Sequence, residues 1–421
     1  MDVDQEQIQV RLVSRQEKHA IPDAAIRVPT AFKRFGLSEI VNNLLSHEKP
    51  IPFDFFLDGQ ILRTSLADYL SEKRLSTENT LTIEYVESML PPTQLSAFQH
   101  DDWISSVKAH NGLFLTGSYD NMLRLWNKSG ECVATFTGHS DAVKSVAFGP
   151  STDSEAIILS GSLDHTLMAW AYNADNGTQR DLYECKGHKA PIESISVNAD
   201  KELMASGSAD STIKIWSTAE PEEDEEETAA AGKSKRRKTE KKSDRKTKAS
   251  MCTLEGHVGA VNAVVFDDSD SSVVYSGGWD HSIRSWNIEQ QVNLVTKNCE
   301  KVVLDVDYSS RSRLIATGHA DNVLRLWDPR SEEGTNVKQS LRGHSAWISS
   351  VSWSKTSEHL LCSGSYDSTV RVWDIRSKGP LYTVNAADAS SNSKVLSVDW
   401  DEQFIISGGE DKHLRIYQTK A

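Results

Sequence analysis

One short motif recurs along most of this chain, and its near-constant spacing limits the possible folds more than any other feature. Each copy begins with Ser or Thr followed by Gly, has an Asp three residues after the Gly, and ends six residues after that Asp. The copies end at Trp126, Trp170, Trp216, Trp286, Trp327 and Trp373, and a seventh ends at Tyr417. Subtracting successive positions gives spacings of 44, 46, 70, 41, 46 and 44 residues. Self-similarity at one period predicts a repeat fold in which each unit packs against its neighbours.

The residues within and before each copy predict β-strands. The segment after the Asp alternates apolar and polar side chains, as in the Leu-Arg-Leu-Trp that ends at Trp126, and this is the period of a half-buried strand. The Asp falls at a turn, where its side chain can bond nearby backbone groups. A Gly-His pair lies upstream of most copies, at Gly138-His139, Gly187-His188, Gly256-His257 and Gly343-His344, with Gln99-His100 as a weaker version.

These features resemble the WD40 repeat family. The resemblance implies a mainly β fold, a seven-bladed β-propeller over residues 93–421, closed by a strand at residues 93–98. It also implies one hydrogen-bonded network per blade, which would contain His139, Ser160, Asp164 and Trp170 in blade two, and His344, Ser363, Asp367 and Trp373 in blade six. Blades five and seven lack the Gly-His pair, so we expect incomplete networks there. Catalysis or metal binding by the repeated His and Asp is the alternative, but a spacing repeated once per blade favours packing.

Residues 1–90 have a different pattern, which predicts a small α+β domain. QIQVRLVS alternates like a strand, GLSEIVNNLLS has apolar residues at helical spacing, and Asp58-Gly59 marks a hairpin between two short strands. A short helical turn and a last strand, TLTIEYV, complete an order that resembles the ubiquitin (β-grasp) superfold. No Gly-Gly pair follows Tyr85, so we expect a docking domain rather than a conjugated modifier. A structural cap on the propeller is the alternative.

The longest spacing, between Trp216 and Trp286, contains a charged insertion. An acidic block over residues 220–227 is followed by a basic run that contains Lys233, Lys235, Arg236, Arg237 and Lys238. Charge blocks without aromatic residues cannot form a core, so we expect residues 219–250 to be disordered between blades three and four. The basic run is typical of a nuclear localisation signal, and a solvated loop of mixed charge is the alternative.

Charge, cysteine usage and the absence of motifs argue against several classes of function. The net charge is −14, to which residues 1–92 contribute −4 and residues 219–250 contribute +1, leaving −11 for the rest. A surface that acidic is not expected to bind nucleic acid non-specifically. The five Cys include no CxxC pair, which argues against a zinc site or a disulfide framework. No nucleophile-elbow, P-loop or zincin motif is present, so we expect neither an enzyme nor a cofactor.

The pairing of the two domains resembles the WD-repeat ribosome biogenesis factor of PeBoW-type complexes. The resemblance covers the whole chain, and rests on this pairing, on the segment PFDFFLDGQILRTSL and on the basic run. It implies a non-enzymatic assembly factor of the large (60S) ribosomal subunit, involved in pre-rRNA processing in the nucleus, nucleolus and nucleoplasm. The propeller would bind a second WD-repeat assembly factor. The ubiquitin-like domain would dock on the metal-ion-dependent adhesion site (MIDAS) domain of a midasin-type AAA ATPase, which removes the factor from the pre-60S particle. Direct RNA contact stays open.

The same resemblance implies that a carboxylate of the ubiquitin-like domain reaches the Mg²⁺ ion of that partner domain. Hard cations such as Mg²⁺ prefer oxygen ligands. Glu78 is the residue we expect, because it lies in the loop LSTEN and can project from the domain. Asp58 is an alternative that turn chemistry already explains, and Glu84 falls within a strand, where we expect a solvated side chain.

Five aromatic residues outside the repeated network are candidates for the propeller's partner-binding surface: Trp103, Tyr119, Trp279, Trp347 and Tyr366. They fall near the Gly-His segments or the Asp turns, which meet at one rim in WD40 propellers. Aromatic side chains are enriched in interface cores. The alternative for Trp103 and Trp347 is that they only pack at blade entrances.

A substrate receptor of a cullin-type ubiquitin ligase is the main alternative function. Such receptors resemble this chain in having Trp-Asp-x-Arg after a blade, which occurs here at Trp327-Asp328-Pro329-Arg330 and Trp373-Asp374-Ile375-Arg376. The motif is short and arises readily in WD40 proteins, so it favours a ligase only weakly.

Overall fold

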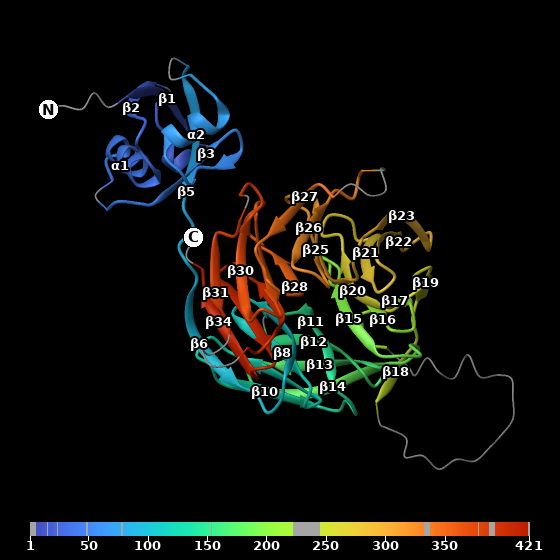
Figure 1. Cartoon of the computed structure of the whole chain (residues 1–421). Coiled ribbons are helices and arrows are strands. Elements are labelled where there is room, and N and C mark those ends of the chain that lie inside the picture. The colour runs from blue at the N-terminus through green and yellow to red at the C-terminus, as the bar shows by residue number, and fades with distance from the viewer. Residues whose placement is uncertain are drawn as a thin grey trace, which may run out of the picture. The chain divides into compact units, whose positions relative to one another are not determined.

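The chain folds as two units that divide after Pro91 (Figure 1). The computed structural model describes residues 6–14, 16–22, 24–47, 49–76, 79–152, 154–221, 245–331, 337–377, 379–386 and 392–419. The first unit contains both helices and strands, whereas the described part of the second is built of strands. No helix among the described residues is long and apolar enough to cross a membrane.

The N-terminal unit has the order of elements expected from the sequence. Its elements are β1 (Gln7–Val13), the 3-10 helix η1 (Glu17–His19), β2 (Ala25–Pro29), α1 (Arg34–Leu45), β3 (Phe53–Leu57), β4 (Gln60–Ile61), α2 (Leu66–Lys73) and β5 (Leu81–Glu87). The sheet order is β2-β1-β5-β3-β4, and β1 runs parallel to β5. Leu37 and Val41 of α1 belong to a buried cluster with Val10, Phe53 and Ile83 of the sheet.

The helix α2 is longer than the short turn that the sequence predicted. The Ser65 hydroxyl accepts a hydrogen bond from the Asp68 N–H at 3.1 Å, and the Asp68 carboxylate accepts one from the Ser65 N–H at 3.2 Å. This capping box satisfies donors that the first helical turn leaves without intrahelical partners. Leu66, Tyr69 and Leu70 are then buried on one side of the helix, which stabilises it through packing.

The described residues of the second unit form seven sheets around a centre (Figure 1). Blade one has β7 (Ile104–His110), β8 (Leu113–Ser118), β9 (Met122–Trp126) and β10 (Cys132–Thr137); blade two has β11 (Val143–Ser151), β12 (Glu155–Ser162), β13 (Leu167–Asn173), β14 (Thr178–Cys185) and β18 (Lys246–Lys248). Blade three has β15 (Ile192–Val197), β16 (Leu203–Ser208), β17 (Thr212–Ser217) and β19 (Cys252–Glu255); blade four has β20 (Val261–Phe266), β21 (Val273–Gly278), β22 (Ser282–Asn287) and β23 (Val292–Asn298).

Blade five has β24 (Val303–Ser309), β25 (Leu314–His319), β26 (Val323–Trp327) and β27 (Gln339–Arg342); blade six has β28 (Ile348–Trp353), β29 (Leu360–Ser365), β30 (Thr369–Asp374) and β31 (Tyr382–Asn385). Blade seven has β32 (Val395–Trp400), β33 (Phe404–Gly409), β34 (His413–Gln418) and β6 (Thr93–Gln99). The first strand of each blade contacts the first strand of the next, and β32 contacts β7 again. The seven-bladed propeller expected from the repeats is therefore confirmed.

The ring is closed by β6, which is the outer strand of blade seven. It pairs antiparallel with β34, from Thr93 opposite Gln418 to Gln99 opposite His413. The closing strand predicted at residues 93–98 is confirmed, and it is one residue longer than expected. Because β6 precedes blade one in the chain, its pairing joins the two ends of the ring and leaves no open sheet edge between the first and last blades.

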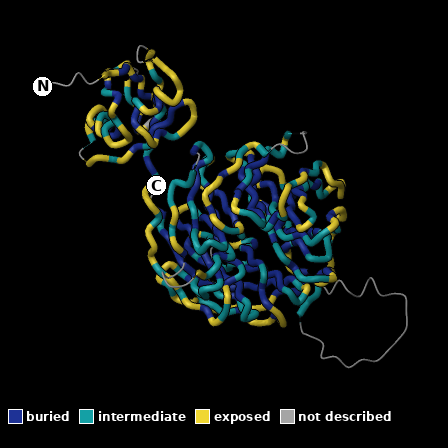
Figure 2. The backbone as a smooth tube through the Cα atoms, in the orientation of Figure 1, coloured by how far each residue is buried: buried dark blue, intermediate teal, exposed yellow. Residues whose placement is uncertain are grey.

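The Gly of the repeat motif lets neighbouring blades approach closely. A Cβ at Gly117 would lie 2.9 Å from the side chains of Val143 and Val146 in the next blade, and a Cβ at Gly277 would lie 2.4 Å from Val303. These distances are too short for carbon atoms, so any other residue would push the blades apart. The close packing leaves buried segments through the interior of the ring and exposed segments mainly at its periphery (Figure 2).

The charged insertion lies within blade three, between β17 and β19, and not between blades three and four as expected. Residues at both of its ends have described positions, which corrects its expected limits of 219–250. The strand β18 pairs parallel with the last residues of β14. Lys246 Nζ lies 3.1 Å from Glu220 Oε1, and Lys248 Nζ donates a hydrogen bond to the backbone oxygen of Ala219. A strand was missed here because the segment Lys-Thr-Lys continues a run of charged residues. The candidate import residues Lys233, Lys235, Arg236, Arg237 and Lys238 lie outside the described residues.

Candidate protein-interaction site

Blades two, three, four and six contain the same buried network. In blade six, Ser363 Oγ lies 2.7 Å from His344 Nε2 and accepts a hydrogen bond from Trp373 Nε1 at 2.8 Å. The other ring nitrogen, His344 Nδ1, lies 2.8 Å from Asp367 Oδ2. The corresponding sets are His139, Ser160, Asp164 and Trp170 in blade two, His188, Ser206, Asp210 and Trp216 in blade three, and His257, Ser276, Asp280 and Trp286 in blade four. The networks expected in blades two and six are confirmed.

The electrostatics of the network favour a structural role for its histidines. Burial lowers the pKa of His344, against the opposite effect of Asp367, and keeps the imidazole neutral. Burial opposes the ionisation of Asp367, but hydrogen bonds from His344 and Thr369 lower the pKa of Asp367 below its usual value. Since both ring nitrogens already have partners, the imidazole has no position left for a metal or a substrate. In the part of the chain that the structure describes, no group of three or more His, Cys, Asp and Glu side chains could hold a metal ion.

Blade five contains only part of the network, as expected, but a histidine from another position replaces the missing one. His319 Nε2 lies 2.7 Å from Thr317 Oγ1, and that hydroxyl accepts a hydrogen bond from Trp327 Nε1 at 2.9 Å. Asp321 pairs with Arg325 at 2.8 Å instead of with a histidine. The signal was present in the sequence TGHAD, where His replaces the Ser or Gly of the other copies.

The hydrogen-bonded network of blade seven is incomplete, as expected. Arg415 donates a hydrogen bond to Asp411 in place of the missing histidine. Tyr417 replaces the tryptophan, and its buried hydroxyl has no hydrogen-bond partner among the described residues.

The five predicted partner-binding aromatic residues lie on one face of the ring, which we call the aromatic face. Trp103 and Trp347 directly precede the first strands β7 and β28, whereas Tyr119, Trp279 and Tyr366 begin the turns between the second and third strands of their blades. These two kinds of connection meet at the same end of each sheet, because the first two strands are antiparallel. The side chains of Trp103, Trp279 and Trp347 are 42%, 56% and 47% exposed.

Two of these tryptophans also pack on a tyrosine of their own blade. The rings of Trp103 and Tyr119 meet edge to face at 5.8 Å, and those of Trp347 and Tyr366 stack at 5.8 Å. Packing at the blade entrance therefore occurs, but it leaves nearly half of each indole in contact with water. Their role in binding stays a prediction.

Val258 is a further exposed apolar residue near Trp279, and the sequence analysis missed it. It follows the Gly-His pair of blade four and is 87% exposed. The equivalent residues after Gly-His in blades two, three and six are the polar Ser140, Lys189 and Ser345. An apolar valine at this position could therefore have indicated an exposed apolar site in blade four. A Cβ built on Gly259 would lie 3.2 Å from Trp279 Cβ, which places the Val258 turn against that tryptophan.

Charged groups near the aromatic face are paired with one another. Lys144 Nζ lies 5.6 Å from the centre of the Tyr119 ring and 3.5 Å from Glu193 Oε2. Lys394 Nζ lies 5.1 Å from the centre of the Tyr366 ring and 2.8 Å from Glu410 Oε1. Lys394 is placed for a cation–π contact with Tyr366, whereas Lys144 donates a hydrogen bond to the Tyr119 hydroxyl at 3.3 Å. The charge of each lysine is offset by a carboxylate.

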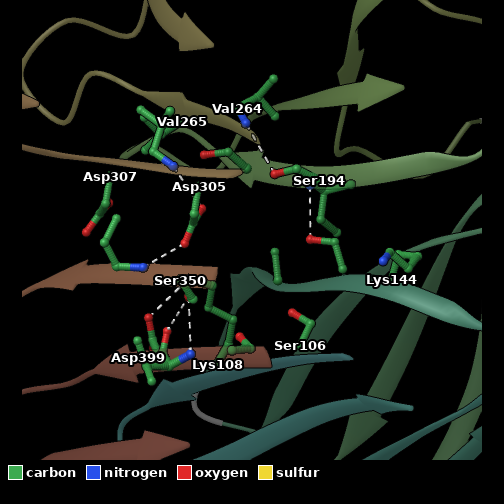
Figure 3. Close-up of a pocket in the computed structure, with 18 of the residues that line it drawn as sticks. Ser106, Lys108, Lys144, Ser194, Val264, Val265, Asp305, Asp307, Ser350 and Asp399 are labelled. Carbon is green, nitrogen blue, oxygen red and sulfur yellow. Dashed lines mark hydrogen bonds and ion pairs between the residues drawn. The ribbon is translucent and has the colours of Figure 1, made fainter. Parts of the chain in front are cut away.

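The centre of the ring is a cavity of about 520 Å³ lined by the first strands of the blades (Figure 3). A hydroxyl or carboxylate on one first strand accepts a hydrogen bond from a backbone N–H of another first strand. These pairs are Ser106 with Val146 (3.2 Å), Ser194 with Val264 (3.2 Å), Asp305 with Val351 (2.8 Å), Ser350 with Val398 (3.2 Å) and Asp399 with Ala109 (2.9 Å). Lys108 Nζ also lies 3.0 Å from Asp399 Oδ1, across the junction of blades seven and one. The polar side chains of this cavity thus hold the blades together.

In the Trp-Asp-x-Arg segment of blade five, the arginine pairs with the aspartate of the same segment. Arg330 donates to Asp328 through Nε at 3.0 Å and through Nη2 at 2.9 Å. This two-pronged pair uses the arginine locally, so the geometry gives no particular support to a ligase adaptor contact.

The structure describes two of the three candidate carboxylates of the ubiquitin-like domain. Glu78 lies outside the described residues. Asp58 is exposed at the turn between β3 and β4, where the Tyr69 hydroxyl donates to its Oδ2 at 2.8 Å. Burial and this hydrogen bond raise the pKa of Tyr69 to about 12, so the hydroxyl remains a donor to Asp58. Glu84 is half-buried within β5.

Comparison with known proteins assigns a family to both units. Residues 8–70 match the NLE (NUC135) domain, and residues 92–127, 130–171, 179–217, 248–287, 291–328, 335–374 and 380–418 match the WD domain, G-beta repeat. The chain is 36% identical over 420 residues to the ribosome biogenesis protein WDR12 homolog of Nematostella vectensis, covering 98% of this chain and 100% of that protein. It is 36% identical over 441 residues to the ribosome biogenesis protein YTM1 of Kluyveromyces lactis, with 99% and 98% covered.

A closed ring of seven blades, four of which contain the same His-Ser-Asp-Trp network, defines the class of WD-repeat propeller proteins. The NLE domain that precedes the ring in the sequence restricts that class to WD-repeat proteins with such a domain. The chain belongs to the WDR12/YTM1 family of ribosome biogenesis proteins, with which it aligns over its whole length. Its relatives support a role in ribosome assembly.

Proposed function

We propose that this chain is a non-enzymatic assembly factor of the large (60S) ribosomal subunit, and that it acts in pre-rRNA processing in the nucleolus and nucleoplasm. The propeller binds a second WD-repeat assembly factor through the aromatic face. The ubiquitin-like domain docks on the MIDAS domain of a midasin-type AAA ATPase, which removes the factor from the pre-60S particle. The observation that supports the first contact is the exposure of Trp103, Trp279 and Trp347 on one face of the ring.

The chemistry of the aromatic face favours a protein partner. Tryptophan and tyrosine are the residues that most often dominate the binding energy of protein interfaces, because they bury a large apolar area. The lysines near Tyr119 and Tyr366 are already paired with carboxylates, so these two charges are partly offset and attract a nucleic acid less strongly. A partner surface with apolar pockets for the indole rings fits it better.

The ubiquitin-like domain contributes the second contact. A carboxylate that projects from it completes the coordination of the partner's Mg²⁺, since hard cations take oxygen ligands. Glu78 is our candidate, and the engagement of Asp58 with Tyr69 supports a structural role for that alternative. Such a metal belongs to the partner.

The basic run of the insertion directs import into the nucleus. Lys233, Lys235, Arg236, Arg237 and Lys238 form a dense cluster of positive charge, which is typical of import signals. The ordered ends of the insertion lie at the outer edge of blade two, away from the central cavity, because β18 pairs with the outer strand β14.

The aromatic contact is tested with Trp279→Ala, using Leu294→Ala as the matched control. Leu294 is 49% exposed on the outer strand of the same blade, so its truncation removes a comparable exposed apolar side chain. An aromatic residue in an interface core contributes about 2 kcal/mol or more, so Trp279→Ala should weaken the complex at least about thirty-fold. The measurement is the affinity of each purified full chain for the WD-repeat factor that co-purifies with the native chain. Unchanged affinity for Trp279→Ala, or an equal loss for Leu294→Ala, would move the contact to another face.

A further inference from the structure

The outer edge of blade two is paired with a segment from a different part of the chain. The strand β18 follows the charged insertion of blade three, yet it pairs parallel with β14 of blade two, with Lys246 opposite Tyr183 and Lys248 opposite Cys185 (Figure 1). The Lys186 N–H donates to the backbone oxygen of Lys248 at 3.2 Å. Blade two therefore has five strands, whereas the other blades, as far as the structure describes them, have four.

Two cationic side chains next to this pairing are bound by acidic and aromatic groups. Arg245 Nη2 lies 2.6 Å from Asp181 Oδ2, and the same guanidinium lies over the ring of Trp170, 5.6 Å from its centre. Lys246 Nζ lies 3.1 Å from Glu220 Oε1. Each cation thus has a carboxylate as its partner, and the arginine is also attracted by the electron-rich face of the indole ring.

A third cation of the same segment lies in a more buried part of the edge. Lys248 is 6% exposed, and its Nζ lies 4.8 Å from the centre of the Tyr183 ring and donates to the backbone oxygen of Ala219. The Tyr183 hydroxyl donates to Thr218 O at 2.8 Å, which fixes the ring that Lys248 contacts. This edge therefore binds both an extended backbone and the cationic side chains that the backbone carries.

Without the cations of residues 245–248, the charged groups of this edge carry a negative charge. The ion pairs of the edge join four carboxylates with two cations that lie outside residues 245–248. The carboxylates are Glu155, Asp181, Glu184 and Glu220, and the two cations are Arg180 and Lys186. Four negative and two positive charges leave −2 for this set, so the edge attracts a cationic segment.

The strand β14 extends well beyond the residues that β18 covers. It spans eight residues, and β18 pairs only with the last three. The first four residues of β14, 178–181, are exposed. In the described part of the chain, no strand pairs with the outer side of residues 178–182. The unpaired backbone groups of a strand edge can take up a further extended segment, and affinity then comes from main-chain hydrogen bonds.

The attachment of β18 allows exchange with such a segment. A parallel pair of three residues makes few hydrogen bonds. The ion pairs of Arg245 with Asp181 and of Lys246 with Glu220 are partly exposed, so water screens them. The chain keeps β18 close to β14, which favours binding of β18 over that of a separate peptide of equal length. A separate segment that pairs with all of β14 makes additional hydrogen bonds and can displace β18.

We propose that the outer edge of blade two is a docking site for an extended, cationic segment of another protein, and that β18 occupies this site when that segment is absent. The incoming segment adds to β14 as a strand and places its Lys and Arg side chains on Asp181, Glu220 and the ring of Tyr183. It displaces the basic end of the insertion from blade two at the same time. The site lies on the outer strand of one blade and not on the aromatic face, so it does not depend on the proposed function.

A synthetic peptide tests the site on the full chain. The probe is a fluorescently labelled Lys-Thr-Lys-Thr-Arg-Lys-Thr-Lys, which ends with the sequence of residues 245–248 and matches the length of β14. Two independent variants remove β18 from the site. Arg245→Ala with Lys246→Ala removes both ion pairs, whereas Lys248→Pro removes a cation and a backbone N–H on the side that faces β14. All three positions lie at the periphery of the ring, away from the blade cores.

Both variants should bind the probe more tightly than the native chain, as measured by fluorescence anisotropy. A site that β18 fills in about nine of ten native molecules lowers the apparent affinity about ten-fold, so each variant should gain about that factor. Equal affinity of the native chain and both variants, or no binding to either variant, would overturn the proposal.

Charge reversal on β14 makes the test specific. In the chain with Arg245→Ala and Lys246→Ala, adding Asp181→Lys should weaken binding of the probe at least ~10-fold, because it replaces an attractive carboxylate with a cation. Asp175→Lys is the matched control, since Asp175 is exposed in the turn before β14. It should leave the affinity unchanged, and equal weakening by the two changes would place the probe elsewhere.

Hydrogen exchange distinguishes the addition of a strand from attraction by charge alone. The probe should slow the exchange of backbone N–H groups in β14 of the variant chains, because it supplies carbonyl partners along the edge. A bound probe that leaves this exchange unchanged would contradict strand addition.

Discussion

Replacement of Ser363 by Ala is the most direct perturbation of the blade network. The Ser363 side chain is fully buried, and its hydroxyl is the partner of both Trp373 Nε1 at 2.8 Å and His344 Nε2 at 2.7 Å. Alanine leaves both nitrogens buried without that partner, and each such loss costs about 1–3 kcal/mol. We expect a loss of about 3 kcal/mol in the free energy of unfolding, because the two losses share one site and do not add fully. For a ring of this size, this corresponds to a fall of roughly 5 °C in the melting temperature.

The assay is thermal unfolding of the full chain followed by circular dichroism, with two controls in the same position or blade. Ser345→Ala removes an exposed hydroxyl next to His344 and should change the stability by less than about 0.5 kcal/mol. Ser363→Thr retains the hydroxyl, as Thr116 and Thr317 do in blades one and five, where they accept from the tryptophan at 3.1 and 2.9 Å. It should recover most of the stability. If Ser363→Ala unfolds at the same temperature as Ser345→Ala, the network does not stabilise the blade as argued.

Two further predictions concern a buried carboxylate and the second docking site. Burial raises the pKa of Asp305 to about 6, so the folded chain binds this proton more tightly than the unfolded chain does. The resulting contribution to the free energy of unfolding is present at low pH and is lost as the pH rises from about 4 through 6. Asp305→Asn keeps an oxygen that can accept from the Val351 N–H; its melting temperature relative to the native chain should therefore rise between pH 4.5 and pH 8, and a difference independent of pH would contradict this. Glu78→Ala should abolish Mg²⁺-dependent binding of the full chain to the partner's MIDAS domain, measured with Mg²⁺ and with a chelator, while Asp58→Ala should retain it. The reverse pattern would assign the contact to Asp58.

The sequence predicted most of the architecture because the repeat is local. A motif of eleven residues identifies each blade, and the position of its tryptophan predicts where the strands around it begin and end. The ring-closing strand was predictable because the resemblance to WD40 propellers implies closure by a strand from the start of the propeller, and residues 93–98 lie directly before blade one. The N-terminal helix was predictable from apolar spacing, whereas α2 was underestimated because its capping box depends on the geometry of Ser65 and Asp68.

What the sequence did not predict depends on contacts between blades. The motif glycines were expected only as part of a hairpin, yet Gly277 is required because Val303 of the next blade lies against it. Likewise, Ser106 and Asp305 in the first strands looked like ordinary polar positions, and their role in joining blades follows only from the ring. His319 was overlooked because its replacement of the missing histidine depends on how β25 places it beside Thr317.

The central claim is that this chain is a protein-binding factor of ribosome assembly, and affinity purification of the tagged full chain tests it most directly. The bound proteins are identified by mass spectrometry and the bound RNA by hybridisation to precursor rRNA sequences. We expect a second WD-repeat factor, large-subunit precursor rRNA and a midasin-type ATPase in the purified material. Trp279→Ala should reduce the recovery of the WD-repeat factor. Purification of a cullin adaptor without precursor rRNA would contradict the account.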